Sequence, residues 1–433
     1  MPVARVVLLL TGLLALPAAG GADAPPAAVV GLQYRPLEDI LREVVARPDL
    51  DGALVGVQVA RVPDGRVVFA HHPDQLINPA SVTKVFTTAA ALCLLHPDFR
   101  FKTEIYARSQ AEAGAIEGPL YMKGYGDPFL VNERLTYLAS YLHTMGIEKI
   151  DGPLILDDGY FDEVREGPGW SQDDSSRPYQ APMGALSLNF NTVAVLFFPG
   201  EAEGKPARIE LYPGTDAVKL VNKTTTALRG TRCTIDVDKR NHTTRVRVGG
   251  RVALHHPGSR THCRVTNPTW YTGHAFRQEL RRAGVRIRRG VRRGAVPAWA
   301  ELVYTLRSPA LGELVRKVNK RSQNFMAEQL FKSMGAELLG PPGTWYKGQQ
   351  VMGAFLEEEL GIPQGTYVLH NGSGLNDVNR VTAGMVVRVL VGMWKRFEVR
   401  PDFLASLALS GADGTVANRL AHPAIDRTMR LKT

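Results

Sequence analysis

Apolar and polar residues alternate in two short runs near the amino terminus of the chain. The stretches GALVGVQVARV (52–62) and GRVVFAHH (65–72) are rich in β-branched residues, which favour strands. Pro63, Asp64 and Gly65 lie at the junction between them, and these are typical turn residues. The pattern predicts a β-hairpin over residues 52–72.

A helix is predicted directly after the hairpin, in NPASVTKVFTTAAALCLLHP at residues 78–97. Asn78 is a favourable cap, and Pro79 fits the first helical position, where an N–H group has no partner anyway. His96 and Pro97 end the pattern. The apolar residues that recur at the spacing of one helix face are Val82, Val85, Phe86, Ala89, Ala90 and Cys93.

The pattern of apolar and polar residues changes twice along the chain, whose 433 residues favour more than one domain. From about residue 99 to about residue 302, short alternating segments such as KTEIYA, RIELYP and CTIDVD are separated by Gly and Pro turns. Helical periodicity then returns in segments such as NFMAEQLFKSMG. The pattern predicts an α+β protein in which a domain formed by residues 27–98 and 303–433 is interrupted by a β-rich insertion of two subdomains, residues 99–302.

The first residues, MPVARVVLLLTGLLALPAAGGADA, combine an early arginine, a short apolar run and a stretch of small residues. This is the layout of a secretory signal peptide, which we assign to residues 1–22. An uncleaved membrane anchor is the alternative for this segment. No later run has the uninterrupted apolar length of a membrane helix, so we expect an exported, periplasmic protein.

The chain carries a formal net charge of +10, part of which lies in RRAGVRIRRGVRR at residues 281–293. Such a run is compatible with nucleic-acid binding. The alternation in VRIRR instead predicts a half-exposed strand with outward arginines, and export separates the chain from nucleic acid. We therefore expect no nucleic-acid partner, and a solvated basic face that makes peripheral contact with an anionic cell-wall surface.

Three cysteines are present. Cys233 and Cys263 lie in neighbouring β-like segments, and an oxidising compartment favours a disulfide between them. Cys93 lies on the apolar side of the predicted helix and is expected to be a buried thiol. The paired histidines at residues 71–72 and 255–256 form no H-E-x-x-H or Cys/His pattern, so we expect no metal site and no cofactor.

Ser81 and Lys84 are the first residues that point to chemistry. Residues three apart on a helix are neighbours, so the amine of Lys84 is expected within reach of the Ser81 hydroxyl. A lysine activates a serine only if burial or nearby positive charge lowers its pKa. The pair S-x-x-K alone is also compatible with an ordinary helix start and a solvated lysine, so it identifies no function by itself.

Two further fragments accompany this pair in a fixed order. Ser322 and Asn324 lie between two predicted helices, in an expected extended turn that points a hydroxyl and an amide to one side. Lys432 and Thr433 follow the turn GADGT, where a strand at a cleft would present a second ammonium to a carboxylate. The loop HNGSGLN (370–376) is either a ligand loop or a tight connection beside the cleft, and its turn residues favour the connection. The ordered set S-x-x-K, S-x-N and K-T is far more specific than each fragment.

With these motifs, the sequence resembles the D-alanyl-D-alanine carboxypeptidase/endopeptidase family of low-molecular-mass, class C penicillin-binding proteins. The matching stretches run to the last residue, and that family has domains inserted between S-x-x-K and S-x-N in a β-lactamase/transpeptidase-like domain, an antiparallel sheet with helices. The matching stretches are NPASVTKVFTTAAAL, MKGYGDPFL, GW followed by YQAPMGALSLNFN, SQNFMAEQL, HNGSGLN, SGADGTVANRL and RLKT.

The resemblance implies a serine peptidase that acts on peptidoglycan stem peptides and is inhibited covalently by β-lactam antibiotics. It implies that Ser81 is the acylated nucleophile, that Lys84 is its base, and that Ser322 relays a proton to the leaving amine. The backbone amide of Ser81 would supply half of the oxyanion hole.

The resemblance also implies residues that bind the substrate. Asn324 would orient it, and Lys432 and Thr433 would bind the terminal carboxylate of a D-Ala-D-Ala peptide. An acidic residue of the insertion recognises the diamino-acid side chain in this family, and Asp173 or Asp174 is the nearest match, of which we assign Asp174.

The printed sequence departs from the family pattern at its end, because the family motif reads K-T-G and the sequence stops at Thr433. We therefore expect a truncated copy without its carboxyl-terminal strands and helix, weakly active or inactive. A β-lactamase or esterase on the same scaffold is an alternative, although the long insertion argues against a dedicated β-lactamase. A non-catalytic peptidoglycan-binding remnant is the third interpretation.

Overall fold

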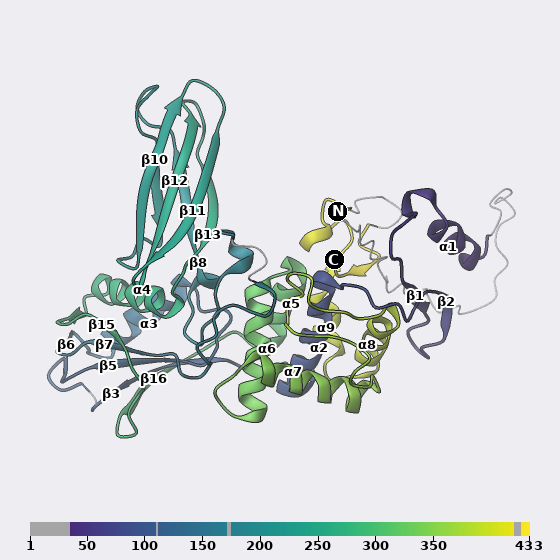
Figure 1. Cartoon of the computed structure of the whole chain (residues 1–433). Coiled ribbons are helices and arrows are strands. Elements are labelled where there is room, and N and C mark those ends of the chain that lie inside the picture. Colours follow the sequence, from purple (N-terminus) through teal and green to yellow (C-terminus); the bar gives the residue numbers. More distant parts are fainter. Residues whose placement is uncertain (1–34, 110, 171–174, 420–425) are drawn as a thin grey trace, which may run out of the picture.

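The computed structural model describes residues 35–109, 111–170, 175–419 and 426–433. The predicted signal peptide and the assigned Asp174 lie outside these residues. Within the described ranges, none of the helices combines the length and apolar character that a bilayer crossing requires. Figure 1 shows a helical part, a sheet-rich part beside it, and a long projection of strands that rises from the sheet-rich part.

Helix α2 (Thr83–Leu95) is the central element of the helical part, and all of its residues except Cys93 and Leu94 are buried. The predicted single apolar stripe is therefore incomplete, because small residues cover the other faces and allow neighbouring helices to approach. The other helices of this part are α5 (Leu311–Arg321), α6 (Asn324–Leu339), α7 (Trp345–Ala354) with its π-helical continuation (Phe355–Glu359), α8 (Ala383–Lys395) and α9 (Arg400–Ser406).

The predicted hairpin is confirmed. Strand β1 (Val57–Ala60) pairs antiparallel with β2 (Val67–His71). The hairpin contacts α8 on one side and the short helix α1 (Leu37–Val45) on the other. A second small antiparallel sheet is formed by β17 (Ala408–Leu409) and β18 (Arg430–Leu431).

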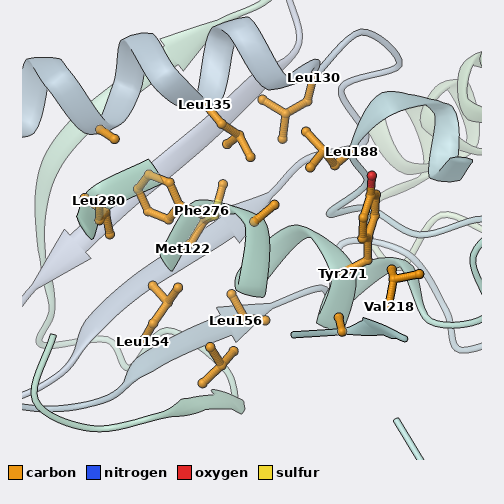
Figure 2. Packing of buried hydrophobic residues seen from close by; sticks show 14 of the residues in the cluster. Met122, Leu130, Leu135, Leu154, Leu156, Leu188, Val218, Tyr271, Phe276 and Leu280 are labelled. Atoms are coloured by element: carbon orange, nitrogen blue, oxygen red, sulfur yellow. The ribbon is translucent and has the colours of Figure 1, made fainter. Parts of the chain in front are cut away.

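A mixed five-stranded sheet is the base of the sheet-rich part, in the order β15-β7-β5-β3-β16. Helices α3 (Asn132–Thr144) and α4 (Pro268–Arg282) lie on one face of it, and neither was predicted. Figure 2 shows the apolar core that these two helices form with the sheet. The strands are β3 (Lys102–Ala107), β5 (Leu120–Gly124), β7 (Leu154–Asp157), β15 (Val291–Arg293) and β16 (Glu301–Arg307).

Two further three-stranded sheets build the projection and its base, in the orders β10-β12-β11 and β13-β8-β9. In the first, β10 runs parallel to β12 and β11 antiparallel to it. The short strands β4 (Ala115–Ile116), β6 (Lys149–Ile150) and β14 (Arg286–Ile287) form a third. The long strands are β8 (Thr192–Phe198), β9 (Arg208–Tyr212), β10 (Val218–Ala227), β11 (Arg232–Arg240), β12 (Thr243–Ala253) and β13 (Ser259–Arg264).

The helical and sheet-rich parts are joined by two chain segments that lie side by side. Ser308 N donates to Phe101 O at 2.8 Å, and Leu311 N donates to Phe99 O at 2.9 Å. The chain therefore leaves and re-enters the helical part at adjacent points. The long insertion between these points does not separate α2 from α5 and α6, which remain in contact.

The predicted disulfide is wrong, because Cys233 and Cys263 are both free thiols. Cys233 lies on β11 opposite Gly250, whereas Cys263 lies on β13 opposite Val193 in the other sheet. The two cysteines lie in similar β-like segments of the sequence, but the strands that carry them do not pair with each other. Cys93 is a free, half-buried thiol packed against the core of the helical part, and burial raises its pKa to about 11.

The basic segment 281–293 alternates largely as expected. Arg286 and Arg288 are exposed on either side of the buried Ile287. The segment is not one strand, however, because its first two residues end α4 and the rest is divided between β14 and β15. The exposed arginines form a solvated face, since the buried valines and isoleucine occupy the inward positions.

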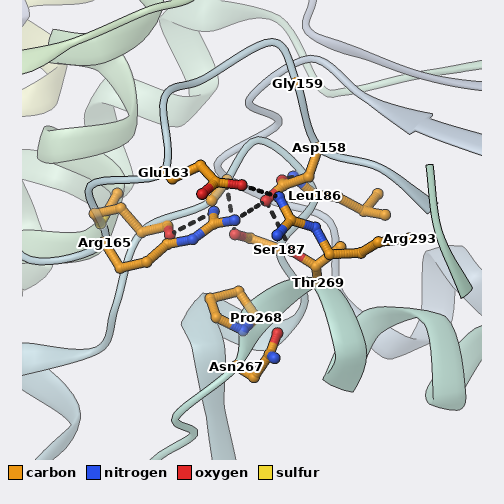
Figure 3. A network of polar contacts seen from close by, with 12 residues as sticks. Asp158, Gly159, Glu163, Arg165, Leu186, Ser187, Asn267, Pro268, Thr269 and Arg293 are labelled. Carbon is orange, nitrogen blue, oxygen red and sulfur yellow. Dashed lines mark hydrogen bonds and ion pairs between the residues drawn. The ribbon is translucent and has the colours of Figure 1, made fainter. Parts of the chain in front are cut away.

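A buried carboxylate at the end of β7 ties the segment after β7 to the start of α4 (Figure 3). Asp158 accepts hydrogen bonds from Leu186 N at 2.6 Å and from Thr269 Oγ1 at 2.7 Å, and it forms an ion pair with Arg165. Arg165 also donates to Met183 O at 3.1 Å. The chain between residues 165 and 186 is thereby held at both ends, which is important because part of it lies beside α6.

Replacing Phe276 by Ala tests the core under α4, where this side chain is fully buried. We expect the free energy of unfolding to fall by about 3–5 kcal/mol, because a large cavity is left. Urea denaturation followed by circular dichroism measures this. Phe397→Ala is the matched control, since Phe397 is 78% exposed; equal losses in both variants would contradict the core assignment.

Candidate active site

Ser81 lies in a single 3₁₀ turn (Ala80–Val82) that leads into α2. Asn78 Oδ1 accepts a hydrogen bond from Ala80 N at 2.9 Å, but the prediction that Asn78 caps the helix is wrong, because the N-cap residues of the turn and of α2 are Pro79 and Val82. The helix itself begins at Thr83 and not at Pro79, because Ala80 adopts a positive φ of 44°. This bend places the half-buried Ser81 hydroxyl at the amino-terminal end of α2.

Lys84 is completely buried, and its amine contacts two oxygens. Nζ lies 2.9 Å from Ser81 Oγ and 2.7 Å from the carbonyl oxygen of Ser373. Burial lowers the pKa of Lys84 well below its ordinary value, the positive charge of Lys432 lowers it further, and the carboxylate of Glu328 acts in the opposite direction. An amine in this environment is able to be neutral and to accept a proton from Ser81.

Ser322 and Lys432 form a second hydroxyl–amine pair, with Lys432 Nζ 3.0 Å from Ser322 Oγ. Ser322 ends α5 in a left-handed conformation with φ of 53°, so the expected extended turn at S-x-N is wrong. Lys432 directly follows β18, as expected of a strand at a cleft. Burial lowers the pKa of Lys432 to about 7.

Asn324 and Thr433 have other partners in this structure. Asn324 is the first residue of α6, and its Nδ2 donates to Tyr179 O at 3.2 Å. Thr433 Oγ1 lies 2.7 Å from Thr415 Oγ1. The structure therefore brings Ser81 together with Lys84, and Ser322 with Lys432. The charge of Lys432 lowers the pKa of Lys84, so the two amines lie near enough to interact electrostatically.

The loop at residues 371–374 is the main part of the site whose role the sequence analysis did not assign, since a connection beside the cleft was favoured there over a ligand loop. Its carbonyl groups contact α2: Gly372 O accepts from Thr87 Oγ1 at 2.7 Å, and Ser373 O accepts from Lys84. Gly374 has a φ of 74°, and a Cβ there would lie 1.8 Å from Ala80 O. Only glycine permits this approach, and the repeated glycines in HNGSGLN were the available signal.

One wall of the site comes from the segment that Asp158 and Arg165 anchor. Asn376 Nδ2 donates to Gly169 O at 2.7 Å, and Asn371 Nδ2 donates to Pro168 O at 3.3 Å. Tyr179, from the same segment, accepts the bond from Asn324. The insertion therefore contributes backbone to the surroundings of Ser81.

A serine hydroxyl in contact with a buried lysine amine, accompanied by a second hydroxyl–lysine pair, is the arrangement found in a class of proteins: serine hydrolases that work through an acyl-enzyme with lysine as the base. The comparisons with known proteins give the particular family. Residues 37–433 match the model of the D-Ala-D-Ala carboxypeptidase 3 (S13) family, and the chain belongs to this family.

Two curated relatives extend the comparison. The chain is 32% identical over 426 residues to a D-alanyl-D-alanine carboxypeptidase from Actinomadura sp. (strain R39), covering 95% of this chain and 79% of the relative. It is 25% identical over 387 residues to the D-alanyl-D-alanine carboxypeptidase DacB from Haemophilus influenzae, covering 88% of this chain and 80% of the relative.

The fold is similar to that of penicillin binding protein 4 (dacB) from Haemophilus influenzae. Its crystal structure superposes with a TM-score of 0.75 at 24% identity, covering 86% of this chain and 82% of the other. The structure of the same protein complexed with a β-lactam gives a TM-score of 0.70 at 24% identity, over 87% of this chain and 82% of the other. The expected α+β, transpeptidase-like fold with inserted domains is thereby confirmed.

The low pKa of Lys432 predicts how its replacement by Met changes the pH dependence of stability. Between pH about 7 and 10.5, the two values of this lysine, the unfolded chain binds a proton there and the folded chain does not. Wild-type stability should therefore rise, relative to that of Lys432→Met, as the pH increases through this window. Urea denaturation at pH 6, 8 and 10 measures the difference, and a constant difference would contradict the prediction.

Proposed function

We propose that this protein is an exported serine-type D-alanyl-D-alanine carboxypeptidase/endopeptidase that cleaves peptidoglycan stem peptides through an acyl-enzyme on Ser81. The observation that carries the proposal is the fully buried amine of Lys84, 2.9 Å from Ser81 Oγ. The family of the chain and the names of its relatives supply the substrate class.

In the acylation step, neutral Lys84 takes the proton of Ser81 while Oγ attacks the carbonyl carbon of the penultimate D-Ala. The carbon–nitrogen bond breaks while Ser322 Oγ gives its proton to the leaving amine and takes in exchange the proton that Lys84 holds, so that Lys84 is neutral again. The backbone N–H of Ser81 stabilises the charge on the attacked oxygen. Water then attacks the ester with Lys84 again as base, which releases the shortened peptide and restores the serine.

The substrate is held by groups around the second pair. Lys432 and Thr433 bind the terminal carboxylate of the peptide, and Asn324 orients its backbone. A carboxylate beside Lys432 favours the ammonium form of this lysine, so substrate binding itself restores the positive charge that burial opposes. β-Lactams react as analogues of the same peptide, with the ring amide in place of the scissile bond.

The proposal also includes export to the periplasm and peripheral contact with the cell wall. The amino-terminal layout supports secretion to the periplasm, where stem peptides are found. The exposed arginines of residues 281–293 support peripheral contact with the anionic wall, and no nucleic acid partner is proposed.

The direct test is a covalent adduct. We expect mass spectrometry to find the added mass of benzylpenicillin on Ser81, and Ser81→Ala to show none. Lys84→Met should lower the rate of adduct formation by about 10²–10⁴-fold, because the general base is lost. Lys219→Met, at a lysine whose side chain is 62% exposed, is the matched control and should react like the wild type.

The outcomes separate the alternatives. A long-lived adduct and release of D-Ala from a D-Ala-D-Ala peptide support the proposal. Rapid release of hydrolysed penicillin indicates a β-lactamase instead. Binding to peptidoglycan that survives Ser81→Ala, without any adduct in the wild type, indicates a non-catalytic protein and overturns the proposal.

Asp174 is proposed to recognise the diamino-acid side chain of the stem peptide. Asp174→Asn should then raise KM at least about tenfold for a peptide with a free side-chain amine, the scale of one lost charge-assisted hydrogen bond, and leave KM unchanged when that amine is acetylated. Asp173→Asn is the matched control. Equal KM values for both peptides in Asp174→Asn and the wild type would remove Asp174 from the site.

A further inference from the structure

Glu328 is a fully buried carboxylate of α6, one helical turn after Asn324. Its Oε1 accepts from Ser373 N at 2.9 Å, and its Oε2 accepts from Gly372 N at 3.0 Å and from Trp345 Nε1 at 2.9 Å. Among the residues that the structure describes, it forms no ion pair. A carboxylate without a cation partner is costly to bury, so these three hydrogen bonds are what keeps it in place.

The loop at residues 371–374 connects this carboxylate to the catalytic helix. In the peptide unit between Gly372 and Ser373, the N–H group faces Glu328 and the carbonyl group accepts from Thr87 on α2. The next carbonyl group, that of Ser373, accepts from Lys84. The loop therefore lies between α6 and α2 with its donors toward Glu328 and its acceptors toward α2.

On the side of the loop away from Glu328, the Ser373 carbonyl fixes the direction of the Lys84 amine. A neutral amine has two N–H groups and one lone pair. When one N–H donates to Ser373 O, the rotation of the amine is restricted, and the lone pair is available to Ser81 Oγ. If the Ser373 carbonyl shifted, the amine would lose its only partner other than Ser81 among the contacts described.

The charge of Glu328 acts on Lys84 in addition to the position of the loop. The charged groups that act on Lys84 are Lys432, which lowers its pKa, and Glu328, which raises it. A base whose pKa is too low accepts a proton poorly. The negative charge behind the loop therefore limits the effect of burial and stabilises the ammonium that forms when Ser81 loses its proton.

We propose that Glu328 is a positioning residue for the general base: it holds the peptide units of residues 372–374 so that the Ser373 carbonyl aims Lys84 at Ser81. Glu328 does not touch the substrate; it acts through its hydrogen bonds to the loop and through its charge on Lys84. This inference rests on the proposed function, because it assigns a role within acylation of Ser81.

The test uses Glu328→Gln in the full chain and the pH profile of benzylpenicillin acylation. An amide cannot accept from all three donors, so we expect the rate constant to fall by about 10²-fold, the scale of a small misplacement of a catalytic group. Loss of the negative charge should also move the acid limb of the profile to lower pH. Glu337→Gln, an exposed glutamate of the same helix that is bonded to Tyr160, should change neither.

A merely structural role would reduce the amount of folded protein and leave the profile of the remaining active protein unmoved. That result, or a wild-type rate in Glu328→Gln, overturns the inference. If Glu328→Gln does not fold, Glu328→Asp decides the question: it keeps the charge but withdraws the carboxylate from the loop, so the rate should fall at least about tenfold with the acid limb in place. A wild-type rate in that variant also overturns the inference.

The proposed function fails separately from this inference. If wild-type protein gains no penicillin on Ser81, acylation itself is refuted. If the wild type is acylated and the Glu328 variants behave like it, the proposed function stands and only the role of Glu328 is refuted.

Discussion

The structure depends on the removal of one lysine amine from water beside a serine hydroxyl. Lys84 and Lys332 are both completely buried in the helical part, but their partners differ. Lys332 lies 2.6 Å from the carboxylate of Asp162 and above the ring of Trp345. Lys84 has only neutral oxygens within hydrogen-bonding distance among the contacts described. Burial lowers the pKa of Lys332, but the hydrogen bond to Asp162 opposes this effect, whereas burial lowers the pKa of Lys84 well below its ordinary value.

Several neighbouring elements contribute to this burial. The small residues of α2 allow α5 and α6 to pack closely and exclude water from the amine. The positive φ of Ala80 turns Ser81 toward Lys84, and glycine at position 374 lets the loop approach that turn. Asn379 supports both sides, since its Nδ2 donates to Asn371 O and lies 3.2 Å from Thr83 Oγ1. The insertion adds a wall through the segment that Asp158 anchors.

The sequence was sufficient for features that depend on short spacing. The contact of Ser81 with Lys84 follows from a separation of three on a helical turn, and the hairpin follows from alternation and turn residues. It was insufficient where distant strands choose partners. The disulfide between Cys233 and Cys263 failed because their strands pair with β12 and β8 instead of each other. Helices α3 and α4 were missed because the surrounding strands and turns dominated the pattern.

Glu328 illustrates a third kind of limit. A glutamate within NFMAEQLFKSMG is an ordinary helix residue by propensity, and charged residues are usually solvated. Its burial becomes apparent only when α7 and the loop at residues 371–374 cover the same face of α6. Residues that violate local rules tend to lie at functional sites. Here the local pattern could not show the violation, because the groups that bond Glu328 lie 17 and 45 residues further along the chain, where only the tertiary fold decides contacts.

The two lysines of the site impose opposite requirements on one small volume. In the proposed mechanism, Lys84 must lose its proton to act as a base, whereas Lys432 must carry a proton to attract a carboxylate. Burial opposes the charge of both lysines, and the charge of Lys432 also lowers the pKa of Lys84. In the proposed mechanism, a substrate carboxylate beside Lys432 favours the ammonium form of Lys432, and the charge of Lys432 favours the neutral form of Lys84. Substrate binding and activation of Ser81 are thus coupled by electrostatics, because the carboxylate that is bound leaves Lys84 as the neutral member of the pair.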